Sequence, residues 1–190
     1  MPIDGEAGVG YMMREGFDLP PLMFTRDEIV ALVAGARMVR AFGGAAMARA
    51  AEEALVKIGA VLPDSEKDRI ARTEIHSPMW VVSDAERIAI DLIERAVERR
   101  DVLTLDYKDE AGRSSARDVR PLGLWFWGKV WTLIAWCEMR DDFRAFRIDR
   151  IAEVTPAGRT FRPERGKQLT DYYRTIERRE EPTGDRTFSR

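Results

Sequence analysis

Three arginines alternate with large apolar residues near the middle of the second half of the chain, and their side chains are well suited to bind an anion. Arg144, Arg147 and Arg150 stand in the sequence RAFRIDR. A guanidinium group carries forked donors that match phosphate oxygens, and it cannot be buried cheaply without a partner. One interpretation is structural, because Asp149 lies close enough to Arg147 for a local pair and the other arginines can be solvated. The alternative is a basic surface, backed by aromatic residues, that receives phosphate or nucleic acid.

The strands that must position these arginines lie in residues 119–151. This stretch holds four of the five tryptophans, which are Trp125, Trp127, Trp131 and Trp136. Residues 130–137 are apolar on both faces of a strand, which predicts a strand covered on two sides. Turn signals at 127–129 and 139–142 flank it. Residues 143–150 then predict the next strand of an antiparallel meander, with Phe146 and Ile148 in the core and Asp149 orienting an arginine.

The other elements follow from caps and periodicity. Thr25 with Glu28, and Ser83 with Glu86, have the form of capping boxes that begin helices. Apolar spacing extends these helices to Gly43 and to about residue 100. Similar signals predict helices over 45–58, after Pro63 and over 167–179, and strands over 103–108 and 152–155. A helix followed by about five short antiparallel strands predicts an α+β protein with a small SH3-like or Sm-like barrel.

Composition excludes several classes of protein. The 190 residues are 45% hydrophobic and 34% charged, with a net charge of −2, and no apolar run is long enough for a membrane span. We therefore expect a cytoplasmic protein. His76 and Cys137 are the only residues of their types, so the sequence predicts neither a disulfide nor a metal site, and it predicts Cys137 as a core residue. Without a phosphate loop or nucleophile motif we predict no enzyme and no cofactor.

Three motifs carry a family resemblance. RPLGL, then G-x-x-W-x-L-x-A-W-C, then R-x-F-R-x-D-R-I, resemble the WYL domain of bacterial transcriptional regulators, and most closely the YafY-like type with an N-terminal winged helix-turn-helix. The central Trp-Tyr-Leu of the family reads Trp131-Thr132-Leu133 here, so the tyrosine is absent. The resemblance implies a domain that senses single-stranded nucleic acid or a nucleotide-like ligand. The residues carried over to that role are Arg120, Trp131, Arg144, Arg147 and Arg150, with Tyr107 as a further candidate.

The resemblance also implies how the chain is organised. Residues 1–24 would be the remnant of a winged-helix wing and a linker, 25–82 a helical linker and dimerisation segment, 83–165 the WYL domain, and 166–190 a C-terminal helix and disordered tail. Duplex DNA would be bound only through helices upstream of this wing. The chain is then expected to be the effector-sensing, homodimeric part of a regulator. A freestanding Sm-like protein that binds single-stranded nucleic acid is the alternative.

Overall fold

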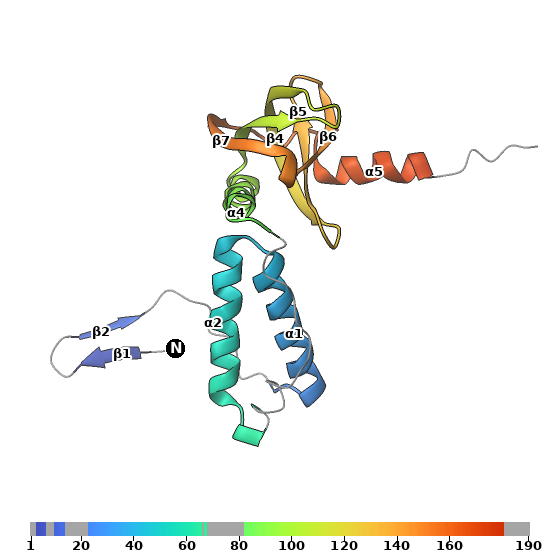
Figure 1. Cartoon of the computed structure of the whole chain (residues 1–190). Helices are drawn as coiled ribbons and strands as arrows, with labels where there is room; N and C mark the ends of the chain where they lie inside the picture. Colours follow the sequence, from blue (N-terminus) through green and yellow to red (C-terminus); the bar gives the residue numbers. More distant parts are fainter. Residues whose placement is uncertain (1–2, 7–9, 14–22, 66, 68–81, 181–190) are drawn as a thin grey trace, which may run out of the picture.

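The chain folds into a helical hairpin joined to a β-sheet domain (Figure 1). The computed structural model describes residues 3–6, 10–13, 23–65, 67 and 82–180. Helix α1 (Arg26–Phe42) and helix α2 (Ala45–Val61) form the hairpin. Strands β1 (Ile3–Glu6) and β2 (Gly10–Met13) pair antiparallel and form a β-hairpin. That this hairpin is a winged-helix wing stays a prediction.

Five strands form one antiparallel sheet in the order β6-β5-β4-β3-β7. The domain that contains this sheet consists, in chain order, of α4 (Asp84–Arg99), β3 (Asp101–Lys108), β4 (Ser114–Phe126), β5 (Trp131–Cys137), β6 (Asp142–Arg147), the 3-10 helix η1 (Ile148–Arg150), β7 (Ile151–Thr160) and α5 (Leu169–Glu180). The predicted α+β class is confirmed. The sheet is open, with β6 and β7 as its edges, so closure into the predicted SH3-like or Sm-like barrel is not confirmed.

The two faces of the sheet are covered by different helices. Helix α4 begins at the predicted capping box of Ser83 and Glu86, and it packs Ile90 and Ile93, both 0% exposed, against Leu133 and the neighbouring strands. On the opposite face, α5 places its aromatic residues against Trp125 of β4 and Phe143 of β6. Strand β5 is therefore buried on both faces, as its two apolar faces predict. Cys137 is a free, buried core residue, which confirms its prediction.

Two strand predictions are corrected. The strand predicted over 143–150 ends at Arg147, because Ile148 turns into the core, where it is 2% exposed, and starts the 3-10 turn η1. Phe146 and Ile148 are both core residues, as predicted. The last strand predicted over 152–155 is longer than expected, since β7 pairs with β3 along most of its length. His76, most of the short helix predicted after Pro63, and the predicted tail lie outside the described residues.

A polar joint fixes the hairpin to α4. The guanidinium group of Arg87 donates to the carbonyl oxygens of Gly43 (2.6 Å) and Ala41 (2.6 Å) at the end of α1. One turn along α4, the carboxylate of Asp91 accepts two hydrogen bonds from the backbone N–H of Ala46, at 3.1 and 3.0 Å, in the first turn of α2. A cation thus meets the C-terminus of one helix and an anion the N-terminus of the next, which is the favourable arrangement for helix dipoles. We call this contact the Arg87–Asp91 joint.

Candidate functional site

Tyr107, Arg147 and Arg150 come together at one end of the sheet. Tyr107 lies near the end of β3, Arg147 ends β6, and Arg150 ends η1 directly before β7. The Tyr107 ring meets the ring of core residue Phe146 edge-on at 5.0 Å, so the protein interior fixes its position. Tyr107 also lies near the Arg150 guanidinium group and contributes, after Glu110, to raising the pKa of that arginine. We call Tyr107, Arg147 and Arg150 the arginine cluster.

Each arginine of the cluster has a carboxylate of this chain as its partner. Arg147 donates to both oxygens of Asp149, from Nε at 3.0 Å and from Nη2 at 2.7 Å. Arg150 donates from Nη1 to Glu110 at 3.0 Å. The hydrogen bond that Arg147 donates to Asp149 lowers the pKa of Asp149 and raises that of Arg147. The hydrogen bond that Arg150 donates to Glu110 raises the pKa of Arg150. The structure therefore contains the predicted local pair of Arg147 with Asp149, in which Asp149 orients the arginine.

These carboxylates do not bury the cluster. The side chain of Arg147 is 42% exposed, and that of Glu110, in the turn between β3 and β4, is 85% exposed. A hollow of about 400 Å³ adjoins the cluster and includes Lys108, Glu110 and Arg150 in its lining. An exposed ion pair contributes little to stability, because water screens it. An anion with several oxygens can consequently replace Glu110 at low energetic cost.

Arg120 lies elsewhere, in an ionic network on the face of the sheet that α5 covers. Its Nε donates to Glu138 at 2.9 Å, and its Nη1 donates to Glu164. Arg159 of β7 donates to both oxygens of Glu138, at 3.1 and 2.6 Å. The hydrogen bonds from Arg159, and after them those from Arg120, lower the pKa of Glu138 to about 2. Arg120 thus ties the β5–β6 turn to the segment after β7.

Trp131 connects the sheet to the α1–α2 hairpin. Its indole Nε1–H donates to the carbonyl oxygen of Phe42, the last residue of α1, at 2.7 Å. The ring also stacks at 5.1 Å on Phe126, which in turn lies 5.0 Å from the ring of Phe42. The polar atom and the flat ring of Trp131 are therefore both engaged within the chain.

Arg144 is separated from Arg147 by the geometry of strand β6. Arg144 lies opposite Ala135 and Arg147 opposite Thr132, so the two arginines point to opposite faces of the sheet. Arg144 pairs instead with Asp142, at 3.1 Å. The structure brings together three of the six predicted site residues and leaves Arg120, Trp131 and Arg144 at separate places. A role in ligand binding for those three stays a prediction.

Sequence reasoning missed the Arg87–Asp91 joint. The available signal was a pair of opposite charges four residues apart on α4, the helix whose other face enters the core. Gly43 and Gly44, which follow the end of α1, are both buried beside this joint. In the part of the chain that the structure describes, no group of His, Cys, Asp and Glu residues is arranged to hold a metal ion. Nor is any helix of those residues long and apolar enough to cross a bilayer.

The second half of the chain matches a known domain family. Residues 89–156 match the model of the WYL domain. The chain is similar to the uncharacterized HTH-type transcriptional regulator YobV of Bacillus subtilis (strain 168), with 24% identity over 109 residues, which is 55% of this chain and 35% of that protein. Among solved structures, proteasome accessory factor B/C (PafBC) of Arthrobacter aurescens matches 74% of this chain and 22% of its own, at 25% identity and a TM-score of 0.40. The chain therefore spans about a third of the curated relative and less of the solved structure.

Proposed function

Because residues 89–156 of this chain form a WYL domain, we propose that the chain is the effector-sensing and dimerising part of a bacterial transcriptional regulator. The domain binds its effector and does not transform it. The effector is single-stranded nucleic acid or a nucleotide-like anion. The arginine cluster is the observation that carries this proposal, since the partly exposed guanidinium groups of Arg147 (42%) and Arg150 (27%) stand beside a half-buried tyrosine ring.

The chemistry of the cluster supports an anionic ligand with flat bases. Arg147 and Arg150 offer forked donors to phosphate oxygens, and Tyr107 offers an aromatic edge or face for a base. The carboxylates of Asp149 and Glu110 hold the guanidinium groups ready while the site is empty. We also propose that the sheet has an Sm-like fold, and the short η1 link between the edge strands β6 and β7 supports this.

Arg147→Ala is expected to weaken binding of short single-stranded oligonucleotides about tenfold, through loss of one charge-assisted phosphate contact. The slope of log affinity against log salt should also fall by about 0.7 for that contact. Fluorescence anisotropy of labelled DNA and RNA oligonucleotides at several salt concentrations measures both effects.

Arg49→Ala is the matched control, because this exposed arginine of α2 carries the same charge far from the cluster. It should change the affinity less than about twofold. An equal loss in both variants would contradict a site at the arginine cluster. A large drop in the melting temperature of Arg147→Ala would show that this arginine is structural. Absence of oligonucleotide binding at every salt concentration would exclude single-stranded nucleic acid as the ligand.

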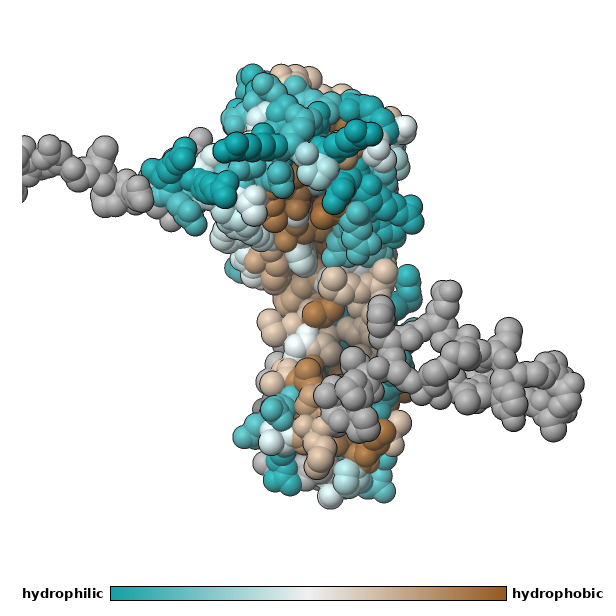
Figure 2. Space-filling view, turned by 180° about the vertical axis from the view of Figure 1, so that it is seen from behind, coloured by the Kyte–Doolittle hydropathy of each residue, from teal (hydrophilic) through white to brown (hydrophobic). Residues whose placement is uncertain are grey.

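The surface of the hairpin supports the dimerising role. Only Val33, Ala41 and Ala51 of α1 and α2 are buried hydrophobic residues. Large apolar side chains remain exposed, and Figure 2 shows apolar residues spread over this lobe; they are Leu32 (45%), Met38 (50%), Met47 (38%), Val56 (65%) and Val61 (82%). Exposed apolar surface of this kind marks an interface, and a second copy of the hairpin has a matching surface.

Val56→Glu is expected to shift the chain from dimer to monomer, because it places a charge within a packed helical interface. Sedimentation equilibrium of the intact chain at several concentrations measures the change. Lys57→Glu, at the neighbouring exposed position, is the control and should leave the dimer intact. A wild-type chain that sediments as a monomer at all concentrations would contradict the dimer.

A further inference from the structure

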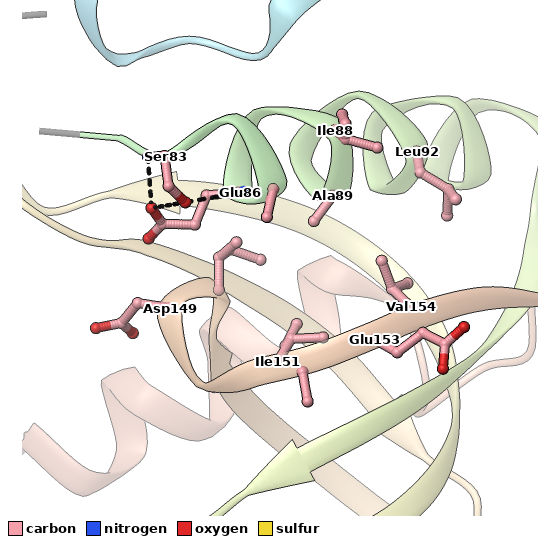
Figure 3. Close-up of a pocket in the computed structure, with 12 residues that line it drawn as sticks. Ser83, Glu86, Ile88, Ala89, Leu92, Asp149, Ile151, Glu153 and Val154 are labelled. Atoms are coloured by element: carbon pink, nitrogen blue, oxygen red, sulfur yellow. Dashed lines mark hydrogen bonds between the residues drawn. The ribbon is translucent and has the colours of Figure 1, made fainter. Parts of the chain in front are cut away.

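A groove separates helix α4 from the edge strand β7, and its lining includes Asp149, the partner of Arg147 in the arginine cluster. It encloses about 580 Å³, which is within the range of binding pockets in proteins. Figure 3 shows Ile88, Ala89 and Leu92 of α4 on one side and Ile151 and Val154 of β7 on the other. The groove is therefore a predominantly apolar cleft between a helix and a strand.

The apolar lining of the groove is open to solvent. Ile88 is 62% exposed, although the α4 residue that follows it, Ala89, is buried in the core. Leu92, Ile151 and Val154 are only partly buried and pack on the edge of the core cluster. Exposed aliphatic surface next to a core costs about 25 cal/mol for each Å² left in water. A partner that covers Ile88 would recover this free energy.

Strand β7 supplies a second, independent feature. It runs over ten residues and, among the residues that the structure describes, it pairs only with β3. The other edge of β7 therefore carries backbone N–H and C=O groups without a strand partner, and such an edge is a template for an added strand. A groove between a helix and a free edge strand is the setting in which extended peptides bind by strand addition.

The charged side chains that line the groove are all acidic. They are Glu86 on α4, Asp149 in η1 and Glu153 on β7 (Figure 3). Asp149 forms an ion pair with Arg147, and Glu86 accepts hydrogen bonds from Ser83 of its capping box. Glu153 lies directly opposite Asp106 of β3, and like charges in such a pair repel. Positive charge from a partner would relieve this repulsion.

We propose that the groove binds an extended, basic segment of a partner protein, which adds to β7 as a sixth strand of the sheet. Apolar side chains of the segment point between Ile88, Leu92 and Val154, and the alternate lysine or arginine side chains point to the other face of the sheet, where they meet Glu153. This groove adjoins the hollow beside the arginine cluster, with which it shares Asp149, Ile151 and Ala152, but the charge of its ligand is the opposite.

The test uses the intact chain and a labelled peptide, acetyl-Lys-Val-Lys-Val-Lys-Val-Lys-amide, with a glutamate-for-lysine counterpart. We expect the basic peptide to bind with a dissociation constant in the micromolar range, roughly 10 to 100 μM, and the acidic peptide to bind at least about tenfold more weakly. Backbone amides of β7 should gain protection from hydrogen exchange when the basic peptide is bound. Methylation of alternate peptide nitrogens should abolish binding, because it removes the strand hydrogen bonds.

Two variants locate the site. Ile88→Arg should weaken binding of the basic peptide about tenfold, since it brings a cation into the groove, and Glu153→Lys about fivefold. Glu177→Lys, the same charge change on α5 across the sheet, should alter affinity less than about twofold. The proposal is overturned if the basic peptide does not bind, if both peptides bind equally, or if Ile88→Arg and Glu177→Lys behave alike while all variants melt as the wild type does.

Discussion

Replacing Gly44 by alanine is expected to lower the free energy of unfolding by about 3 kcal/mol and to release the α1–α2 hairpin from α4. Gly44 precedes α2, and a Cβ atom there would overlap the carboxylate of Asp91 and lie 3.1 Å from Cγ2 of Ile90. If Asp91 rotated away, it would lose its two hydrogen bonds from Ala46 and leave a carboxylate that is 9% exposed without them. Thermal unfolding followed by circular dichroism measures the loss, and limited proteolysis reports the released hairpin.

Gly35→Ala provides a control of opposite sign. Gly35 lies within α1, and a Cβ atom at this position meets no other atom within 4 Å. Alanine should therefore raise the stability of the helix by about 1 kcal/mol, through its higher helix propensity. If Gly44→Ala were as stable as Gly35→Ala, the close approach of Gly44 to Asp91 would not exist in solution.

Trp131→Ala is expected to cost about 3 to 5 kcal/mol of stability, because it removes a large ring from between the sheet and the hairpin. Trp131→Phe should cost only about 1 kcal/mol, since it keeps the contact with Phe126 and loses the hydrogen bond to the Phe42 carbonyl. Chemical denaturation of the two variants separates the hydrogen bond from the packing.

The same pair of variants tests whether Trp131 binds ligand as the family resemblance implies. We expect Trp131→Phe to bind oligonucleotides within about twofold of wild type, because the structure engages Trp131 inside the chain. A tenfold loss of affinity in Trp131→Phe with unchanged stability would place Trp131 at the ligand. In that case Trp131 would exchange its contact with Phe42 for a contact with the base.

The features that sequence predicts well here depend on neighbouring residues. Both capping boxes are present as predicted, because Thr25 and Glu28, and likewise Ser83 and Glu86, are only three positions apart in the sequence. The burial of β5 on both faces follows from its uninterrupted apolar sequence. The pair of Arg147 and Asp149 is also local.

The features that sequence does not predict depend on partners distant in the chain. The alternation of apolar and charged residues continues through Ile148, so this pattern does not indicate that the strand ends at Arg147 and that Ile148 turns into the core. Arg120 has the residue type of a phosphate ligand, yet Glu138 and Glu164 reach it from 18 and 44 positions away. Likewise, nothing near Trp131 in sequence indicates Phe42 as its acceptor, 89 positions away.

The Arg87–Asp91 joint couples the orientation of the α1–α2 hairpin to that of α4, and the point about which the hairpin turns, its pivot, is the Gly43–Gly44 turn. Each helix has 17 residues and is therefore about 25 Å long. A tilt of α4 by about 5° would displace the far end of such a helix by about 2 Å. The pivot is held by directed hydrogen bonds to the helix ends and by the packing of Phe42 on Phe126 and Trp131, so a rotation of α4 is passed on to the hairpin. Small movements in the packing of α4 on the sheet are thus amplified at the opposite end of the hairpin.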